Sequence, residues 1–171
     1  MEREAFRNMN SAQAVEEMMH LYGDQLLRLC AMYLKDVHEA QDAVQETFIK
    51  AYRSWPGFRH DSSELTWLVR IAVRTCRDMR RKTWFKIADL RVPVEGMRAK
   101  PEKDLLDGDV TQAVMALGEK YRLPILLHYY QGLPVKDVAL ILDLPQSTAL
   151  TRLKRGRDQL REKLTEGGDL R

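Results

Sequence analysis

The stretch DVHEAQDAVQETFIKAY, residues 36–52, carries the pattern that decides the fold. Its apolar residues recur at the three- and four-residue spacing of an amphipathic helix, at Val37, Ala40, Val44, Phe48 and Ala51. On a helix that advances about 100° per residue these side chains share one side, and Glu39, Asp42 and Glu46 lie within about 60° of one another on the other. We therefore expect a helix with one buried face and one anionic face.

The anionic face is unusual for this chain, which has a formal net charge of +3 and a pI of about 8.9. Residues 38–48 contain no Lys or Arg, and Gln45 flanks the acidic side chains. A docking surface for a protein partner and an ordinary solvated helix face both fit this pattern. A metal site is not expected, because His38, Glu39 and Asp42 do not converge on one side of the helix.

The composition describes a folded protein, because 44% of the 171 residues are hydrophobic and 31% are charged. The N-terminal residues have no apolar core of the kind that a signal peptide needs, and no run approaches the roughly 18 apolar residues of a membrane span. Cys30 and Cys76 lack CxxC spacing and are expected to be buried, reduced thiols. A cytoplasmic protein without direct membrane insertion is therefore expected.

Helical periodicity dominates on both sides of the acidic helix, and alternating strand patterns are almost absent. We predict an all-α fold of two small helical domains, residues 12–83 and residues 109–165. Residues 84–108 between them contain two prolines, two glycines and mixed charges without a clear period. That composition is typical of a flexible linker.

The segment ELTWLVRIAVRTCRDMRRK, residues 64–82, predicts a second amphipathic helix. Its core face follows helical spacing at Leu65, Leu68, Val69, Ala72, Cys76 and Met79. Its other side carries an arginine stripe at Arg70, Arg74, Arg77 and Arg81. Like charges four residues apart repel each other, so this stripe favours an anionic partner such as a phosphate backbone. A merely solvated face is the alternative.

Aromatic residues lie close to the arginine stripe in the sequence. Trp67 stands one helical turn before Arg70, and Trp55 and Phe58 lie in the preceding loop. Aromatic side chains beside a cationic track grip single-stranded nucleic acid by stacking on its bases. Trp67 fits that role, whereas for Trp55 a place in the core is the stronger expectation.

The segment GLPVKDVALILDLPQSTALTRLKRGRDQLREKL, residues 132–164, predicts a helix-turn-helix. The first helix buries Val135, Val138, Ala139 and Leu142, and the second buries Ala149, Leu153, Leu160 and Leu164. Between them lies the break Asp143-Leu144-Pro145. The second helix presents polar and basic residues outward at Ser147, Thr151, Lys154 and Arg155. This arrangement is typical of a major-groove reader, although helical hairpins that bind no DNA share it.

Taken together, the segments resemble a bacterial RNA polymerase sigma factor of the extracytoplasmic-function (ECF) group. The strings that carry the resemblance are DVHEAQDAVQETFIKAY, TWLVRIA with the trailing RDMRRK, and LGEKYRLPILLHYYQGLPVKDVALILDLPQSTALTRLKRGRDQL. The resemblance covers roughly residues 21–82 and 110–164. It implies a domain for the promoter −10 element, a flexible linker and a domain for the −35 element.

The resemblance also implies which residues make contacts. The acidic helix would dock onto the clamp coiled coil of the largest polymerase subunit through Glu39, Asp42, Gln45 and Glu46. The −10 DNA would be bound by Phe58, Arg59, Trp67, Arg70, Arg74, Arg77 and Arg81. The −35 DNA would be bound by Ser147, Thr148, Thr151, Arg152, Lys154 and Arg155. The C-terminal domain would also touch the polymerase flap.

The sequence departs from the family pattern at several positions. Arg74 stands where Asn is usual, and Glu64 stands where a packing Phe is common. Asp143 and Ser147 replace frequent glycines, and Leu150 replaces a frequent Lys. These departures bear on which promoter sequence is recognised.

The resulting hypothesis is an alternative sigma factor that binds core RNA polymerase and promoter DNA. Control by an anti-sigma factor is also expected, and this expectation comes from the resemblance alone. A stand-alone helix-turn-helix transcriptional regulator is the alternative, but it has no evident use for the acidic helix. No catalysis, cofactor, metal or small-molecule substrate is expected. The sequence shows no converging carboxylate cluster, nucleophile–base motif or Gly-rich phosphate loop.

Overall fold

The computed structural model describes residues 2–90 and 105–168. Helices are the regular elements in these ranges, which confirms the all-α prediction. Within the predicted linker, residues 84–108, the segment 91–104 lies outside the described residues. The helix before this segment continues to Leu90, beyond the expected end of the first domain.

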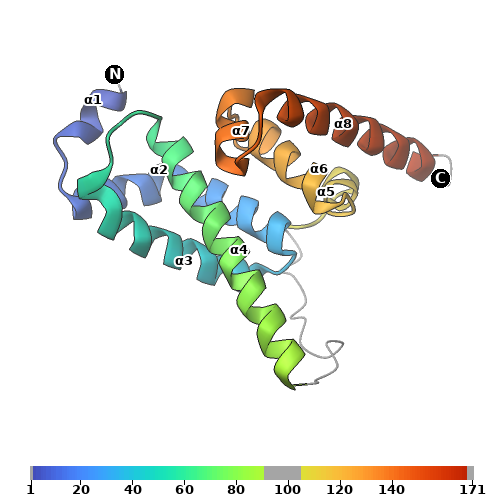
Figure 1. The fold of residues 1–171 in the computed structure, drawn as a ribbon, viewed down its shortest axis with the longest axis horizontal. Coiled ribbons are helices and arrows are strands. Elements are labelled where there is room, and N and C mark those ends of the chain that lie inside the picture. Colours follow the sequence, from blue (N-terminus) through green and yellow to red (C-terminus); the bar gives the residue numbers. More distant parts are fainter. Residues whose placement is uncertain (1, 91–104, 169–171) are drawn as a thin grey trace.

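The N-terminal half consists of helices joined by short turns (Figure 1): α1 is Glu2–Arg7, α2 is Ser11–Leu34, α3 is Val37–Ser54 and α4 is Glu64–Leu90. A capping box starts α2, because the Asn10 side chain accepts the N–H of Gln13 at 3.0 Å and the Gln13 side chain accepts the N–H of Asn10 at 3.1 Å. Asp36 caps α3 by accepting the N–H of Glu39 at 2.8 Å. These caps fix the residues at which α2 and α3 begin.

The C-terminal half contains α5 (Asp109–Met115), α6 (Glu119–Ile125), a π-helical turn (Leu126–Tyr130), α7 (Val135–Leu142) and α8 (Gln146–Gly168). The predicted helix-turn-helix is α7 and α8. Asp143 ends α7 in the left-handed conformation, with φ at 54°, and the N–H of Leu144 donates to the carbonyl of Ala139 at 2.9 Å. Gly156 allows α8 to lie close to α6, since a Cβ there would stand 3.0 Å from Ile125 Cγ1.

The predicted core faces are buried or half-buried, with one exception. The buried residues include Val37, Ala40, Phe48 and Ala51 on α3, Leu68, Val69, Ala72 and Cys76 on α4, and Ala149 and Leu153 on α8. Leu164, predicted to share the buried face of α8, is instead 39% exposed. The reason is that the last turns of α8 run beyond the other helices of the C-terminal half (Figure 1).

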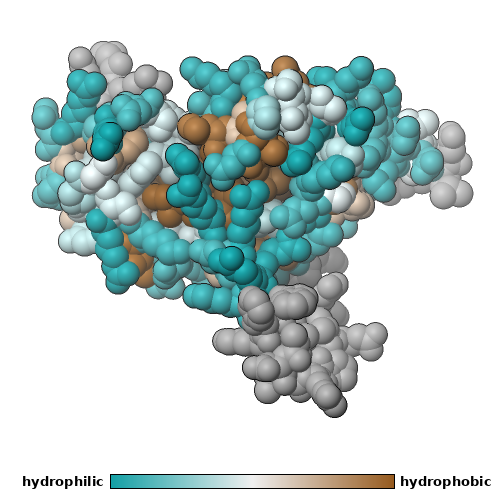
Figure 2. Space-filling model, in the orientation of Figure 1, coloured by the Kyte–Doolittle hydropathy of each residue, from teal (hydrophilic) through white to brown (hydrophobic). Residues whose placement is uncertain are grey.

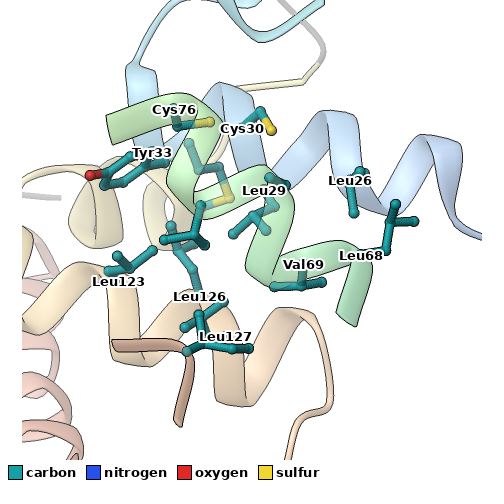
Figure 3. Close-up of a cluster of buried hydrophobic side chains, with 14 of the residues drawn as sticks. Leu26, Leu29, Cys30, Tyr33, Leu68, Val69, Cys76, Leu123, Leu126 and Leu127 are labelled. Carbon is teal, nitrogen blue, oxygen red and sulfur yellow. The ribbon is translucent and has the colours of Figure 1, made fainter. Parts of the chain in front are cut away.

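The two halves share one hydrophobic core (Figure 3). Leu26, Leu29 and Tyr33 of α2 lie beside Leu68 and Val69 of α4, and the C-terminal half adds Leu123, Leu126 and Leu127. All of these side chains are 2% exposed or less. The sequence left open whether the two predicted domains pack together, and in this structure they do.

Cys30 and Cys76 meet inside this core as free, buried thiols, as predicted. A hydrogen bond between the two side chains and their burial raise the pKa of Cys30 well above its ordinary value. The Cys30 thiol is therefore protonated, and both buried side chains pack as small apolar groups.

Polar contacts reinforce the junction of the two halves. The Tyr33 hydroxyl donates to Glu119 Oε1 at 2.8 Å, and Glu119 also pairs with Arg80 of α4. Burial and the hydrogen bond to Glu119 raise the pKa of Tyr33 to about 12. Arg122, only 4% exposed, donates to the carbonyls of Leu117 at 2.8 Å and Tyr33 at 3.4 Å. A buried guanidinium is thus satisfied largely by main-chain carbonyls on both sides of the junction.

The shared core makes a prediction about unfolding. Leu127→Ala should lower the free energy of unfolding by about 2–5 kcal/mol, because it leaves a cavity where the halves meet. Urea denaturation, followed by circular dichroism, should still show one transition for the whole chain. Leu140→Ala is the matched control, since Leu140 is 50% exposed, and should change stability by no more than about 0.5 kcal/mol. Two separated transitions, of which only one shifts, would contradict a common core.

Candidate functional site

The acidic face of α3 is present on the surface, but its members differ in exposure. Asp42 and Gln45 are exposed, whereas Glu39 and Glu46 are half-buried. Glu46 forms a loose ion pair with Lys50, with 3.9 Å between Oε1 and Nζ. Burial, with Asp36 and Asp42 nearby, raises the pKa of Glu39 despite the opposing charge of Arg80. Asp42 and Gln45 are thus the most accessible of the predicted docking residues.

An apolar groove of about 780 Å³ runs between α2 and α3, beside the acidic face. Its apolar lining comes from Val15, Met19, Leu27, Val44, Phe48, Ile49 and Tyr52. Met19 and Tyr52 are about half exposed, at 52% and 51%. Gln45 belongs to both the groove wall and the acidic surface. The groove was not predicted from the sequence. Val15, Met19, Gly23 and Leu27 recur at every fourth residue of α2, which indicates a shared helix side but not a hollow beside it.

The aromatic residues of the α3–α4 loop form one cluster around Trp55. The Trp55 ring lies 5.4 Å from Phe58 and 5.7 Å from Trp67, and Phe58 stacks on Trp67 at 4.6 Å with an interplanar angle of 27°. Trp55 is 7% exposed and belongs to the core, as expected. Phe58 and Trp67 are half-buried, so part of each ring is open to solvent.

Glu64 joins this cluster through a histidine. It is 4% exposed, and its Oε1 lies 3.3 Å from Nδ1 of His60. His60 is held in the left-handed conformation, with φ at 56°, and its ring contacts Phe58 at 4.5 Å. The position that often holds a packing Phe in the family is therefore occupied by a carboxylate–imidazole pair.

The predicted arginine stripe lies along α4, and Arg74, Arg77, Arg81 and the loop residue Arg59 are exposed. Arg81 is not unopposed, because its guanidinium contacts Asp78 Oδ1 at 2.9 Å. Arg70 is half-buried, and its Nε is buried without a hydrogen-bond partner. The nearby Thr66 hydroxyl donates to Asp137 of α7 at 3.1 Å. The first turns of α4 therefore lie against the C-terminal half.

The recognition helix α8 presents its predicted residues largely as expected. Ser147, Thr151, Lys154 and Arg155 are exposed, and Thr148 and Arg152 are half-buried. Leu150 is 51% exposed beside them. Arg155 and Lys120 lower the pKa of Tyr121, because both cations lie next to its hydroxyl. Apolar surface also gathers over α7, where Leu140 is exposed (Figure 2).

Within residues 2–90 and 105–168, no three His, Cys, Asp or Glu side chains come together as a metal site. Across the same ranges, no helix combines the length and apolar character needed to cross a bilayer.

Family models match both halves of the chain. The model of Sigma-70 region 2 matches residues 18–86, and the model of Sigma-70 region 4 matches residues 107–160. The ECF RNA polymerase sigma factor SigW of Bacillus subtilis is 33% identical, over 90% of each chain. This chain is an ECF sigma factor. The RNA polymerase sigma-H factor of Pseudomonas aeruginosa is 30% identical, over 86% of this sigma factor and 84% of the relative.

Solved structures share the fold of this sigma factor. The sigma factor RpoE from Bartonella quintana, solved with the anti-sigma factor NepR, is 25% identical with a TM-score of 0.76, over 88% of this chain and 96% of that one. CnrH, solved with the cytosolic domain of CnrY, is 20% identical with a TM-score of 0.68, over 95% and 94% of the two chains, and this shows the fold alone. The match of region 2 to the N-terminal half disfavours a stand-alone regulator, because it places the acidic helix and the arginine stripe in a sigma-factor segment.

Proposed function

We propose that this sigma factor binds core RNA polymerase through α2 and α3 and promoter DNA through α4 and α8. The observation that carries this proposal is the separation of charge. The acidic face and the apolar groove lie on α2 and α3, whereas exposed basic residues lie along α4 and α8. A protein partner and a polyanion thus meet different surfaces of one molecule.

The docking surface combines the groove with Asp42, Gln45 and Glu46 on its rim. An amphipathic helical partner gains by burying Met19, Tyr52 and their neighbours, at about 25 cal/mol per Å² of apolar area removed from water. The acidic rim then favours a partner with basic residues beside its apolar stripe, because complementary charge steers association and fixes register. The clamp coiled coil of the largest polymerase subunit has this character in the family that the sequence resembles.

Promoter contacts are divided between the two halves. Phe58 and Trp67 form a stacked platform next to the arginines of α4, which suits an unstacked −10 base and its phosphates. The exposed polar face of α8 suits the major groove of the −35 element, where Leu150 can meet a thymine methyl group. The exposed Leu140 of α7 provides an apolar contact for the polymerase flap.

We also infer that this sigma factor is cytoplasmic and controlled by an anti-sigma factor, and that it performs no catalysis of its own. The support is that the similar sigma factor RpoE of Bartonella quintana was solved with the anti-sigma factor NepR. The residue ranges 12–83 and 109–165 remain our proposal for the two functional domains, joined by residues 84–108.

The direct test of the proposed function is co-migration with sigma-free bacterial core polymerase on a sizing column. A stoichiometric complex is expected. Absence of a complex, with the sigma factor shown to be folded by circular dichroism, would overturn the proposal. Run-off transcription from a random-sequence promoter pool then identifies the promoters that the holoenzyme opens.

Charge reversal tests the docking surface. The double variant Asp42→Lys and Glu46→Lys should lose core binding by at least about 100-fold, because two like-charged contacts replace two favourable ones. The fold should survive, since Asp42 is exposed and Glu46 makes only a loose pair with Lys50. The matched control is Asp158→Lys with Glu162→Lys, an equal change of charge on exposed residues of α8. Equal binding by the two double variants would refute docking through α3.

Removal of basic residues tests the −35 contact. The double variant Lys154→Ala and Arg155→Ala should bind a selected −35 duplex more weakly and reduce the slope of log K against log salt by about one to two units. Arg161→Ala with Lys163→Ala removes the same charge near the end of α8 and serves as the control. Fluorescence anisotropy at several salt concentrations gives both slopes. An unchanged slope for the first pair would show that its side chains do not meet phosphate.

A further inference from the structure

The N-terminal helix α1 folds back onto the aromatic cluster of the α3–α4 loop. Phe6 is 2% exposed, and its ring meets Trp55 edge-on, with centroids 6.1 Å apart and planes at 62°. The indole N–H of Trp55 donates to the carbonyl of Met9 at 3.0 Å. The N–H of Met9 in turn donates to the carbonyl of Phe6 at 3.2 Å, so both contacts come from one compact turn.

The turn is itself anchored. Asn10, the residue after Met9, caps α2 together with Gln13. The capping contacts therefore tie Met9 to the start of α2. Phe6 is tied to the same point through its hydrogen bond with Met9. α1 and this turn precede residue 18, where the region-2 match begins. The family match thus assigns no role to this segment.

Trp55 connects α1 to Phe58 and Trp67, the two aromatics that the proposed function places against DNA. Its ring touches Phe58, His60 and Trp67, and only 7% of its surface is exposed, so it supports the platform from beneath without reaching a base itself. A flipped base gains stacking energy only where the platform is already held in place, since ordering it during capture would consume part of that energy. Two groups from α1 and its turn contact Trp55 on the other side: the Phe6 ring and the carbonyl of Met9.

We propose that Phe6 and the carbonyl of Met9 are positioning elements for promoter melting, which hold Trp55 so that Phe58 and Trp67 receive an unstacked −10 base. This rests on the proposed function of α4 and its loop. Phe6 acts through Trp55 and does not touch DNA. Its removal should slow the melting step and leave core binding unchanged, because the groove and the acidic rim lie on other residues.

The test compares Phe6→Ala with Arg7→Ala, an exposed neighbour on the same helix. Each variant is assembled with core polymerase and given a promoter that the unaltered holoenzyme has selected from a random pool. 2-Aminopurine in the −10 segment reports the rate of opening. Phe6→Ala should open the duplex about tenfold more slowly, whereas Arg7→Ala should match the unaltered protein. On the same promoter with its −10 segment mismatched beforehand, the deficit of Phe6→Ala should shrink below about threefold, because unstacking no longer limits the rate.

Two results would overturn the positioning role. Equal deficits on the duplex and the mismatched promoter would show general damage, and an unchanged rate on both would show that Phe6 is dispensable. If Phe6→Ala does not fold, Phe6→Leu keeps the apolar contact without the ring edge and undergoes the same template comparison. Failure of the unaltered protein to open any promoter would instead refute the proposed function, and this inference with it.

Discussion

Leu26, Leu29 and Tyr33 of α2 pack in one core with residues of α4 and of the C-terminal half. This burial covers one apolar face of α2 and one of α4, and it joins two halves that residues 84–108 separate in the sequence. Charged side chains are left on the outer faces, because burying them unpaired would be costly. Among the described residues, Arg122 and Glu64 are buried exceptions. Main-chain carbonyls, including that of Tyr33, accept hydrogen bonds from Arg122, and Glu64 lies beside the His60 ring.

The division of the surface follows from this packing. Because α3 contacts both α2 and α4, its two remaining sides become the groove and the acidic rim. α4 keeps its arginines outward along its middle, and at its start it meets α7 through Thr66 and Asp137. A sigma factor needs a polymerase-facing surface and DNA-facing surfaces that do not interfere with one another. In the function proposed above they do not overlap, because the polymerase-facing surface lies on α2 and α3 and the DNA-facing surfaces lie on α4 and α8.

The buried faces of α3, α4 and α8 could be predicted because burial follows the helical period, which is visible in local sequence. The outward positions of Asp42, Arg74 and Lys154 followed from the same geometry. The groove could not be predicted in this way, because it depends on how two helices lie against each other. The partial burial of Arg70 and the contact of Phe6 with Trp55 likewise depend on segments distant in sequence. The burial of Leu164 was predicted wrongly, because periodicity does not show where a helix extends beyond its neighbours.

The paired thiols of Cys30 and Cys76 make the shared core chemically observable. Thiolates are the nucleophiles that react with alkylating reagents, and both sulfurs are buried, with Cys30 held in its protonated form. Their modification rate therefore measures how often α2 and α4 part, in the unmodified sequence and without an added label.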